Sequence, residues 1–234
     1  MCTSIGLGAF SSCANLESIE FPQCSNVSNL AFTKTNLISV NFPKCESVGT
    51  GAFSSCSNLT FIDLPKCSTI LNYAFSGCTK LSTINLPVCI SIGSGAFSRC
   101  TALKSINLPC CTTISSTAFI TCTTLSYVNL SACQKINAST FSGCTSLETI
   151  ILGNECSYIG SSAFYNCTSL MNLTLNYPNI VSLANTTAFT YTPMSASAYT
   201  GSFGSVYVPA SLVDSYKTSK NWSTYSSRIT SIPE

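Results

Sequence analysis

Residues 92–109 read Ile-Gly-Ser-Gly-Ala-Phe-Ser-Arg-Cys-Thr-Ala-Leu-Lys-Ser-Ile-Asn-Leu-Pro, and variants of this phrase recur about every 22 residues along the chain. Each copy has a phenylalanine at the same place, and a Cys-x-x-Ile or Cys-x-x-Val step precedes most copies. The phenylalanines are Phe10, Phe32, Phe53, Phe75, Phe97, Phe119, Phe141, Phe164 and, after a longer interval, Phe189. A fixed period of this length is typical of a solenoid of stacked coils. We therefore predict one elongated repeat domain instead of a globule.

Residues 67–88 show how a single coil is expected to fold. In its Leu-x-x-Ile-x-Leu segment, Ile84 and Leu86 alternate with polar residues, which predicts a strand with one buried side. Pro87 then ends the strand, because proline lacks the N–H that a sheet ladder needs. The Cys-x-x-Ile step predicts a second short extended segment, and Phe75 lies at the corner between the two as the largest core side chain.

The composition excludes several classes of function. Charged residues make up 8% of the chain, against roughly 25% in an average soluble domain, and the net charge of +2 is not clustered. We therefore expect no nucleic-acid binding and no attachment to an anionic membrane. The chain has no histidine, so histidine-based acid–base and nucleophilic catalysis is excluded. We therefore expect that the protein is not an enzyme and has no cofactor and no metal site. We also expect no membrane insertion, because no run of 18 apolar residues is present.

Fifteen of the sixteen cysteines follow the repeat in two interleaved series. Three interpretations compete: a disulfide framework, metal binding, and a ladder of free thiols used as small core residues. The period favours free thiols, because stacked side chains point the same way while a disulfide needs converging Cβ atoms. Cys110 lies outside both series, at a position where other coils have lysine, so we expect it to face water.

The complete phrase, Ile-Gly-x-x-Ala-Phe-x-x-Cys-x-x-Leu-x-x-Ile-x-Leu-Pro, resembles the BspA-type (Treponema-type) bacterial leucine-rich repeat over residues 1 to about 189. This resemblance implies a mostly β, right-handed α/β repeat: a leucine-rich-repeat solenoid of about eight coils with a parallel sheet on its concave face. It also implies display on the bacterial cell surface or secretion, with adhesion to a host protein, a matrix protein or a glycan. Most coils here have Leu-Pro-x-Cys where the family more often has Leu-Pro-x-Ser-Val, which shortens each coil by one residue.

The repeat predicts two regions. Residues 1–189 are expected to form the solenoid, and residues 190–234 an irregular loop, ordered over 190–205, followed by a strand-helix-strand cap. The helix is expected to begin with Ser211 as its N-cap. Trp222 is either part of the capping core or a platform for a ligand, and we favour the core. The N-terminal end has no similar cap, so we expect an end-to-end homodimer or an upstream domain to cover it.

The outward positions of the expected concave sheet are the candidate binding surface. Bulky side chains occur there where neighbouring coils have small or polar ones, and Asn or an acid fills one column through six coils. The candidates are Phe61, Asp63, Asn85, Asn107, Tyr127, Asn129 and Ile151. The asparagines are also explained by a stacked amide ladder that stabilises the sheet, and single exposed apolar residues are common.

Two classes of function remain open from the sequence. The first is a non-enzymatic surface binding or adhesion module. The second is a structural or host-recognition domain of a phage virion, in a tail or fibre. No signal peptide is visible, and the many free thiols favour manufacture in a reducing cytoplasm, as phage proteins require. The family resemblance favours the cell surface.

Overall fold

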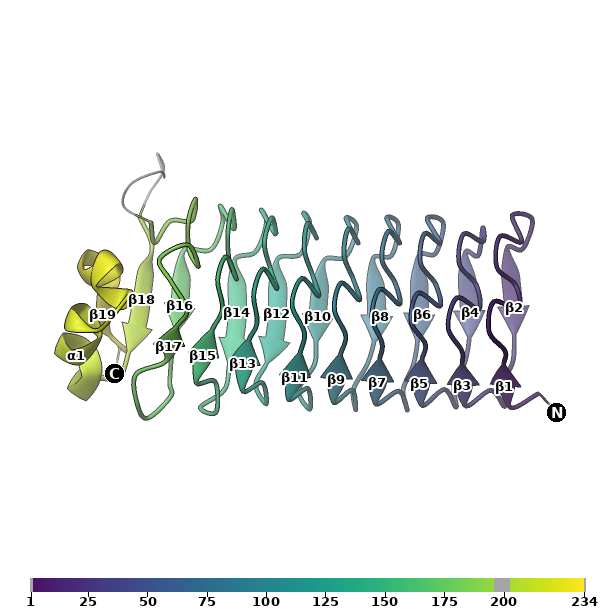
Figure 1. The fold of residues 1–234 in the computed structure, drawn as a ribbon, viewed down its shortest axis with the longest axis horizontal. Coiled ribbons are helices and arrows are strands. Elements are labelled where there is room, and N and C mark those ends of the chain that lie inside the picture. The colour runs from purple at the N-terminus through teal and green to yellow at the C-terminus, as the bar shows by residue number, and fades with distance from the viewer. Residues whose placement is uncertain (1, 196–202, 234) are drawn as a thin grey trace.

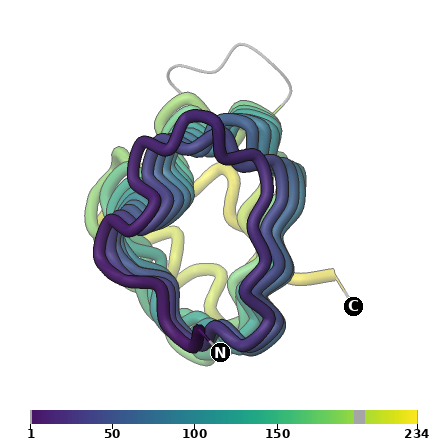
Figure 2. The backbone as a smooth tube through the Cα atoms, turned by 90° about the vertical axis from the view of Figure 1, so that its right-hand side faces the viewer, coloured from purple at the N-terminus to yellow at the C-terminus, as the bar shows by residue number. Residues whose placement is uncertain are grey.

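The computed structural model describes residues 2–195 and 203–233, and it shows an elongated stack of coils (Figure 1). Each regular coil contributes one strand to each of two faces, with corners of tight turns between them. Figure 2, viewed from the N-terminal end, shows the coils superposed along the axis as a nearly closed outline. The repeat solenoid predicted from the period is therefore the fold of this chain.

The Cys-x-x-Ile steps form one face, which is a parallel sheet of nine two-residue strands in coil order. These strands are β1 (Ser4–Ile5), β3 (Asn26–Val27), β5 (Ser47–Val48), β7 (Thr69–Ile70), β9 (Ser91–Ile92), β11 (Thr113–Ile114), β13 (Lys135–Ile136), β15 (Tyr158–Ile159) and β17 (Ser182–Leu183). In the stack, Ile70 pairs with Val48 on one side and Ile92 on the other. The second extended segment predicted for each coil is thus a continuous sheet.

The Leu-x-x-Ile-x-Leu segments form the opposite face, which we call the strand face. Its strands are β2 (Ser18–Glu20), β4 (Ser39–Asn41), β6 (Phe61–Asp63), β8 (Thr83–Asn85), β10 (Ser105–Asn107), β12 (Tyr127–Leu130), β14 (Thr149–Leu152) and β16 (Asn172–Thr174). They are parallel but fall into three ladders: β2-β4-β6-β8, β10-β12-β14, and β16 with two strands from later in the chain. The predicted sheet is present, with breaks between β8 and β10 and between β14 and β16.

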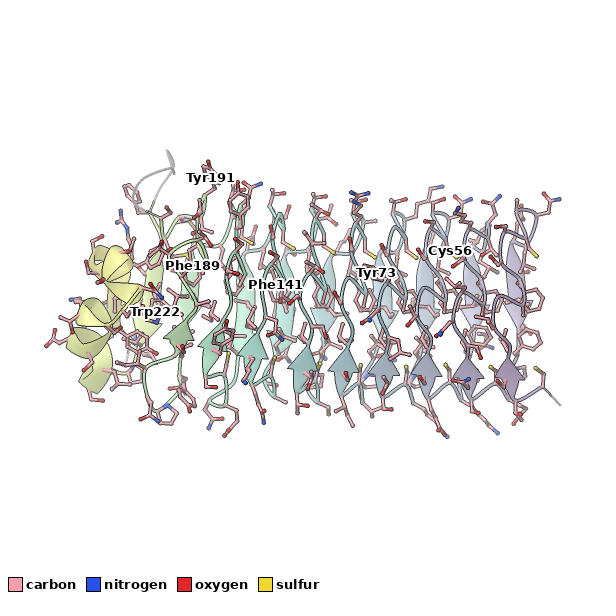
Figure 3. All side chains as sticks on the ribbon, in the orientation of Figure 1. Cys56, Tyr73, Phe141, Phe189, Tyr191 and Trp222 are labelled. Atoms are coloured by element: carbon pink, nitrogen blue, oxygen red, sulfur yellow. The ribbon has the colours of Figure 1, made fainter. Side chains whose placement is uncertain are left out.

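A column of phenylalanine rings runs through the interior. Neighbouring rings from Phe10 to Phe189 lie 5.1–5.7 Å apart between centroids, with planes within 12° of parallel. Figure 3 shows Phe141 and Phe189 inside the stack. Such aromatic pairs contribute about 0.5–1.5 kcal/mol each beyond area burial. The column therefore ties each coil to the next.

The cysteines are free thiols, as predicted, and thirteen of the sixteen are buried. Cys110 is exposed, which confirms its expected contact with water. Cys2 and Cys13 are also exposed, although their series predicts burial. Both belong to the first coil, where no described coil packs above them, so their position in the repeat does not enclose them.

The stack continues past the eight regular coils. Phe189, β17 and β18 (Ser205–Val208) make a ninth coil, and a helical segment followed by β19 (Ile229–Ser231) makes a further turn (Figure 1). This segment contains η1 (Ala210–Leu212), α1 (Val213–Thr218) and η2 (Trp222–Arg228). Ser211 is not the N-cap: it lies inside η1, and α1 begins after Leu212 without a side-chain cap. Part of the loop expected over 190–205 lies outside the described residues.

Candidate functional site

The strand face presents two columns of outward side chains. Its parallel register places Phe61 beside Thr83 and Asp63 beside Asn85, and the same register continues from Ser105 to Tyr127. All seven candidate residues lie on this face, as predicted. Phe61, Tyr127 and Ile151 are 45%, 37% and 41% exposed, because they stand at outward positions of a two-residue alternation.

The amide column is used within the chain, in two separate pairs. The Asn85 side-chain amide donates to Oδ1 of Asp63 at 2.8 Å, and the Asn129 amide donates to Oδ1 of Asn107 at 2.8 Å. The column is interrupted between Asn85 and Asn107, which is where β8 and β10 are not paired. The hydrogen bonds of these four residues therefore favour the interpretation of the column as a ladder that stabilises the sheet over its interpretation as a set of free ligand-binding groups.

A hollow of about 560 Å³ lies on the strand face over the first three coils, and we call it the acidic hollow. It contains Phe61 and Asp63, which are sequence candidates, and four polar residues of the outward columns that were not among the candidates: Ser18, Glu20, Ser39 and Asn41. Ile19 and Val40 complete its lining. One sequence feature could have pointed to this region: Glu20 is an acid in a column that is otherwise mostly asparagine. The hollow shape itself cannot be predicted from the repeat pattern.

A second hollow, of about 460 Å³, lies at the break between β14 and β16. Ile151 lines it together with Glu148, Thr149, Asn172, Thr174, Asn176 and Ile232 of the C-terminal segment. The candidate residues therefore do not converge on one site. Phe61 and Asp63 belong to the acidic hollow, Ile151 to the second, and Tyr127 stands on the face between them.

The buried thiols are poor nucleophiles and poor metal ligands in this setting. Burial raises the pKa of Cys89 and of Cys111 to about 12, so both are protonated near neutral pH.

Over the described residues, no group of three or more Cys, Asp or Glu side chains is arranged to hold a metal ion. The same part of the chain has no helix with the length and apolar character to cross a membrane.

The profile of the BspA type leucine rich repeat region matches residues 1–90 and 68–196, with six copies. The chain belongs to the BspA-type leucine-rich repeat family. The matched ranges contain all nine of the repeat phenylalanines, from Phe10 to Phe189. The resemblance inferred from the repeat phrase is thereby confirmed.

Solved structures of leucine-rich repeat proteins resemble the chain along much of its length. A leucine-rich repeat protein from Bacteroides ovatus has 19% sequence identity and a TM-score of 0.50, covering 99% of this chain and 82% of that one. The T. pallidum leucine-rich repeat protein TpLRR has 26% identity and a TM-score of 0.45, covering 66% of this chain and 83% of that one. A leucine rich cell surface protein from Faecalibacterium prausnitzii has 21% identity and a TM-score of 0.44, covering 81% and 74%. The Bacteroides structure confirms the solenoid fold. A search of curated proteins found no match.

Proposed function

We propose that this BspA-type protein is a non-enzymatic binding module, displayed on a bacterial cell surface or secreted, whose strand face contacts a host protein, a matrix protein or a glycan. The observation that carries the proposal is the exposure of Phe61, Tyr127 and Ile151 on a face whose other outward side chains are small or polar. Large side chains held on a rigid surface are the usual anchors of an interface.

The rigidity of the face supports this proposal. The strands that carry Phe61 and Tyr127 are each paired on both sides, so their backbones are held before a ligand arrives. A preformed surface loses little conformational entropy on binding, which leaves more of the contact free energy for affinity. The family comparison gives no support to the alternative of a phage tail or fibre domain.

The experiment is a protein and glycan array screened with the purified chain and with a Phe61→Ser, Tyr127→Ser double variant. We expect the double variant to lose binding to the ligand that the native chain selects, while its thermal unfolding temperature stays close to the native value. A matched control is Tyr165→Ser with Tyr191→Ser, which removes two exposed aromatic rings away from the strand face; Figure 3 shows Tyr191 at the upper rim.

The control variant should bind like the native chain. If the Phe61 and Tyr127 double variant keeps its full affinity, then the strand face is not the recognition surface and the proposal fails.

A further inference from the structure

The acidic hollow contains polar groups that the chain itself leaves unused. In later coils the corresponding amides pair with a neighbour, as Asn85 does with Asp63 and Asn129 with Asn107. Within residues 2–195 and 203–233, the side chains of Glu20 and Asn41 form no hydrogen bond or ion pair. Register places Glu20, Asn41 and Asp63 side by side on consecutive strands. The hollow thus presents a carboxylate, a free amide and a second carboxylate in a row.

The charge of the hollow is negative and is not balanced locally. Both charged residues in its lining, Glu20 and Asp63, are acids. Two lysines of the neighbouring coils have other partners: Lys44 donates to the side chain of Gln23, and Lys80 donates to Oδ1 of Asn58 at 2.9 Å. A cationic ligand would therefore enter a site with no competing positive side chain in its lining.

An aromatic ring stands beside these acids. Phe61 lines the same hollow and is 45% exposed, so part of its surface is open to a ligand. A guanidinium over an aromatic ring is attracted by the negative face of the π system. The chain makes this contact elsewhere: Cζ of Arg228 lies 3.7 Å from the ring centroid of Phe203.

We propose that the acidic hollow binds an arginine side chain from an extended, basic segment of a partner protein, with the guanidinium against Phe61 and between Glu20 and Asp63. The Cα atoms of these two acids lie two strands apart, or about 10 Å at the usual spacing of parallel strands. The planar guanidinium has five N–H donors, so it can bond to both carboxylates while Oδ1 of Asn41 accepts between them. The Asn85 amide holds Oδ1 of Asp63 and leaves Oδ2 for the ligand. This inference rests on the proposed use of the strand face for binding.

The test uses a fluorescent hexa-arginine peptide and, as its neutral isostere, a hexa-citrulline peptide, with affinity measured by anisotropy. The variants are Glu20→Gln with Asp63→Asn, and separately Phe61→Ser. We expect each variant to weaken hexa-arginine binding about tenfold or more, because charge-assisted bonds and the ring contact are lost. We also expect the citrulline peptide to bind about tenfold more weakly than the arginine peptide, and higher salt to weaken hexa-arginine binding.

A control separates the hollow from the overall charge. Glu46→Gln with Glu155→Gln removes the same number of charges from exposed positions outside the hollow. This control should bind hexa-arginine within about twofold of the native chain, since surface charges beyond a Debye length are screened. Equal weakening by the two double variants, or equal binding of the citrulline peptide, would overturn the proposal.

The outcomes also distinguish this inference from the proposed function. If an array ligand is lost with Phe61→Ser and Tyr127→Ser but binds Glu20→Gln, Asp63→Asn at full strength, then the strand face is the binding surface and the arginine site is wrong. If the array ligand is a neutral glycan that occupies the hollow, the strand face is likewise the binding surface and the arginine site is wrong. If neither set of changes affects any ligand, both the function and the arginine site fail.

Discussion

Cysteine suits the corner positions of this molecule because it is small, apolar and able to donate one weak hydrogen bond. The Cys100 thiol is buried and donates to the carbonyl of Phe75 in the preceding coil at 3.2 Å. Cys78 and Cys122 make the same contact one coil earlier and one coil later. Thr35 occupies the equivalent place in the second coil, but its hydroxyl donates within its own coil, to the Phe32 carbonyl at 2.9 Å. Valine would fill the space but would not donate.

The buried thiols predict a loss of stability at alkaline pH. Burial raises the pKa of Cys89, Cys111, Cys156 and Cys167 to about 12, whereas a thiol in the unfolded chain titrates near about 8.5. Between these values the folded state binds more protons than the unfolded state, so the free energy of unfolding falls as pH rises. Each thiol contributes at most about 1.4 kcal/mol per pH unit in that window. Urea midpoints should be constant from pH 6 to about pH 8 and then decrease.

The matched variant is Cys89→Ala with Cys111→Ala. It should start from a lower stability because two cavities are formed, but its midpoint should decrease less steeply above about pH 9, since two of the titrating thiols are gone. A native midpoint that is flat up to pH 11 would contradict the raised pKa values.

At the scale of the corner turns, glycine and bulky residues compensate each other between coils. Tyr73 has a positive φ of 57°, and its ring lies over Gly95 of the next coil, which also has a positive φ of 60°. A Cβ atom on Gly95 would lie 2.5 Å from Cε1 of Tyr73. Leu30 and Gly51 repeat this arrangement, with a contact of 2.9 Å. In both pairs, a large residue at this corner position lies against glycine one coil later.

We predict that Gly95→Ala is destabilising for two separable reasons. The left-handed backbone costs an alanine about 1–2 kcal/mol, and the clash with the Tyr73 ring adds to this. Tyr73→Ser should remove only the clash, so the two changes together should be less destabilising than the sum of the single effects. Denaturant unfolding of the four proteins in this double-mutant cycle measures the coupling. Strict additivity would show that the ring moves aside without cost.

The cap closes the core by supplying hydrogen bonds that a further coil would otherwise make. The N–H of Val181 donates to the hydroxyl of Tyr216 at 2.8 Å, and the indole N–H of Trp222 donates to the Val181 carbonyl at 2.7 Å. Trp222 is buried against Phe189, with 5.9 Å between ring centroids, and it lies at the C-terminal end of the stack in Figure 3. The sequence interpretation of Trp222 as a core residue is confirmed.

Tyr216→Phe should therefore cost about 1–3 kcal/mol, because it leaves the buried N–H of Val181 without its acceptor while keeping the ring. Tyr165→Phe is the control, since that ring is exposed and away from the cap. Chemical denaturation should place the control close to the native protein. Equal midpoints for the native chain and Tyr216→Phe would mean that water replaces the hydroxyl at no cost.

The repeat predicts the coils well but not the features between them. The alternation of Ile84 and Leu86 identifies strand, core and outward column, because each depends on local pattern alone. The breaks in the strand face and the two hollows depend on how successive coils are spaced. The repeat phrase contains no information about that spacing. The unpaired state of Glu20 and Asn41 likewise depends on side-chain conformations across strands. The hydrogen bonds of the cap join residues about 40 positions apart, so a short sequence pattern cannot predict them.

For the whole molecule, the two ends of the stack differ. The C-terminal end is covered by the helical segment, whereas the Phe10 ring stacks on Phe32 at 5.2 Å with no described ring on its other side. Phe97, in the middle, has stacked rings on both sides at 5.3 and 5.2 Å. Leu7 is 73% exposed near this end, and Leu16, Ile19 and Phe21 are only partly buried. Within the described residues, the outer edge of β2 is also unpaired.

We therefore predict that the 234-residue chain self-associates through its N-terminal coil, unless a longer chain provides an upstream segment there. Two copies related by a two-fold axis would bring both uncovered core ends together and pair the two β2 edges, which removes apolar surface and open strand groups from water. Sedimentation velocity at several concentrations should show a concentration-dependent dimer. Ser18→Lys places a charge on the β2 edge and should shift the protein to monomer, while Ser231→Lys, on the edge of β19 at the other end, should not. A native chain that stays monomeric at high concentration would show that one partly exposed coil is tolerated, since the stacked Phe32 and the coils below already supply its stability.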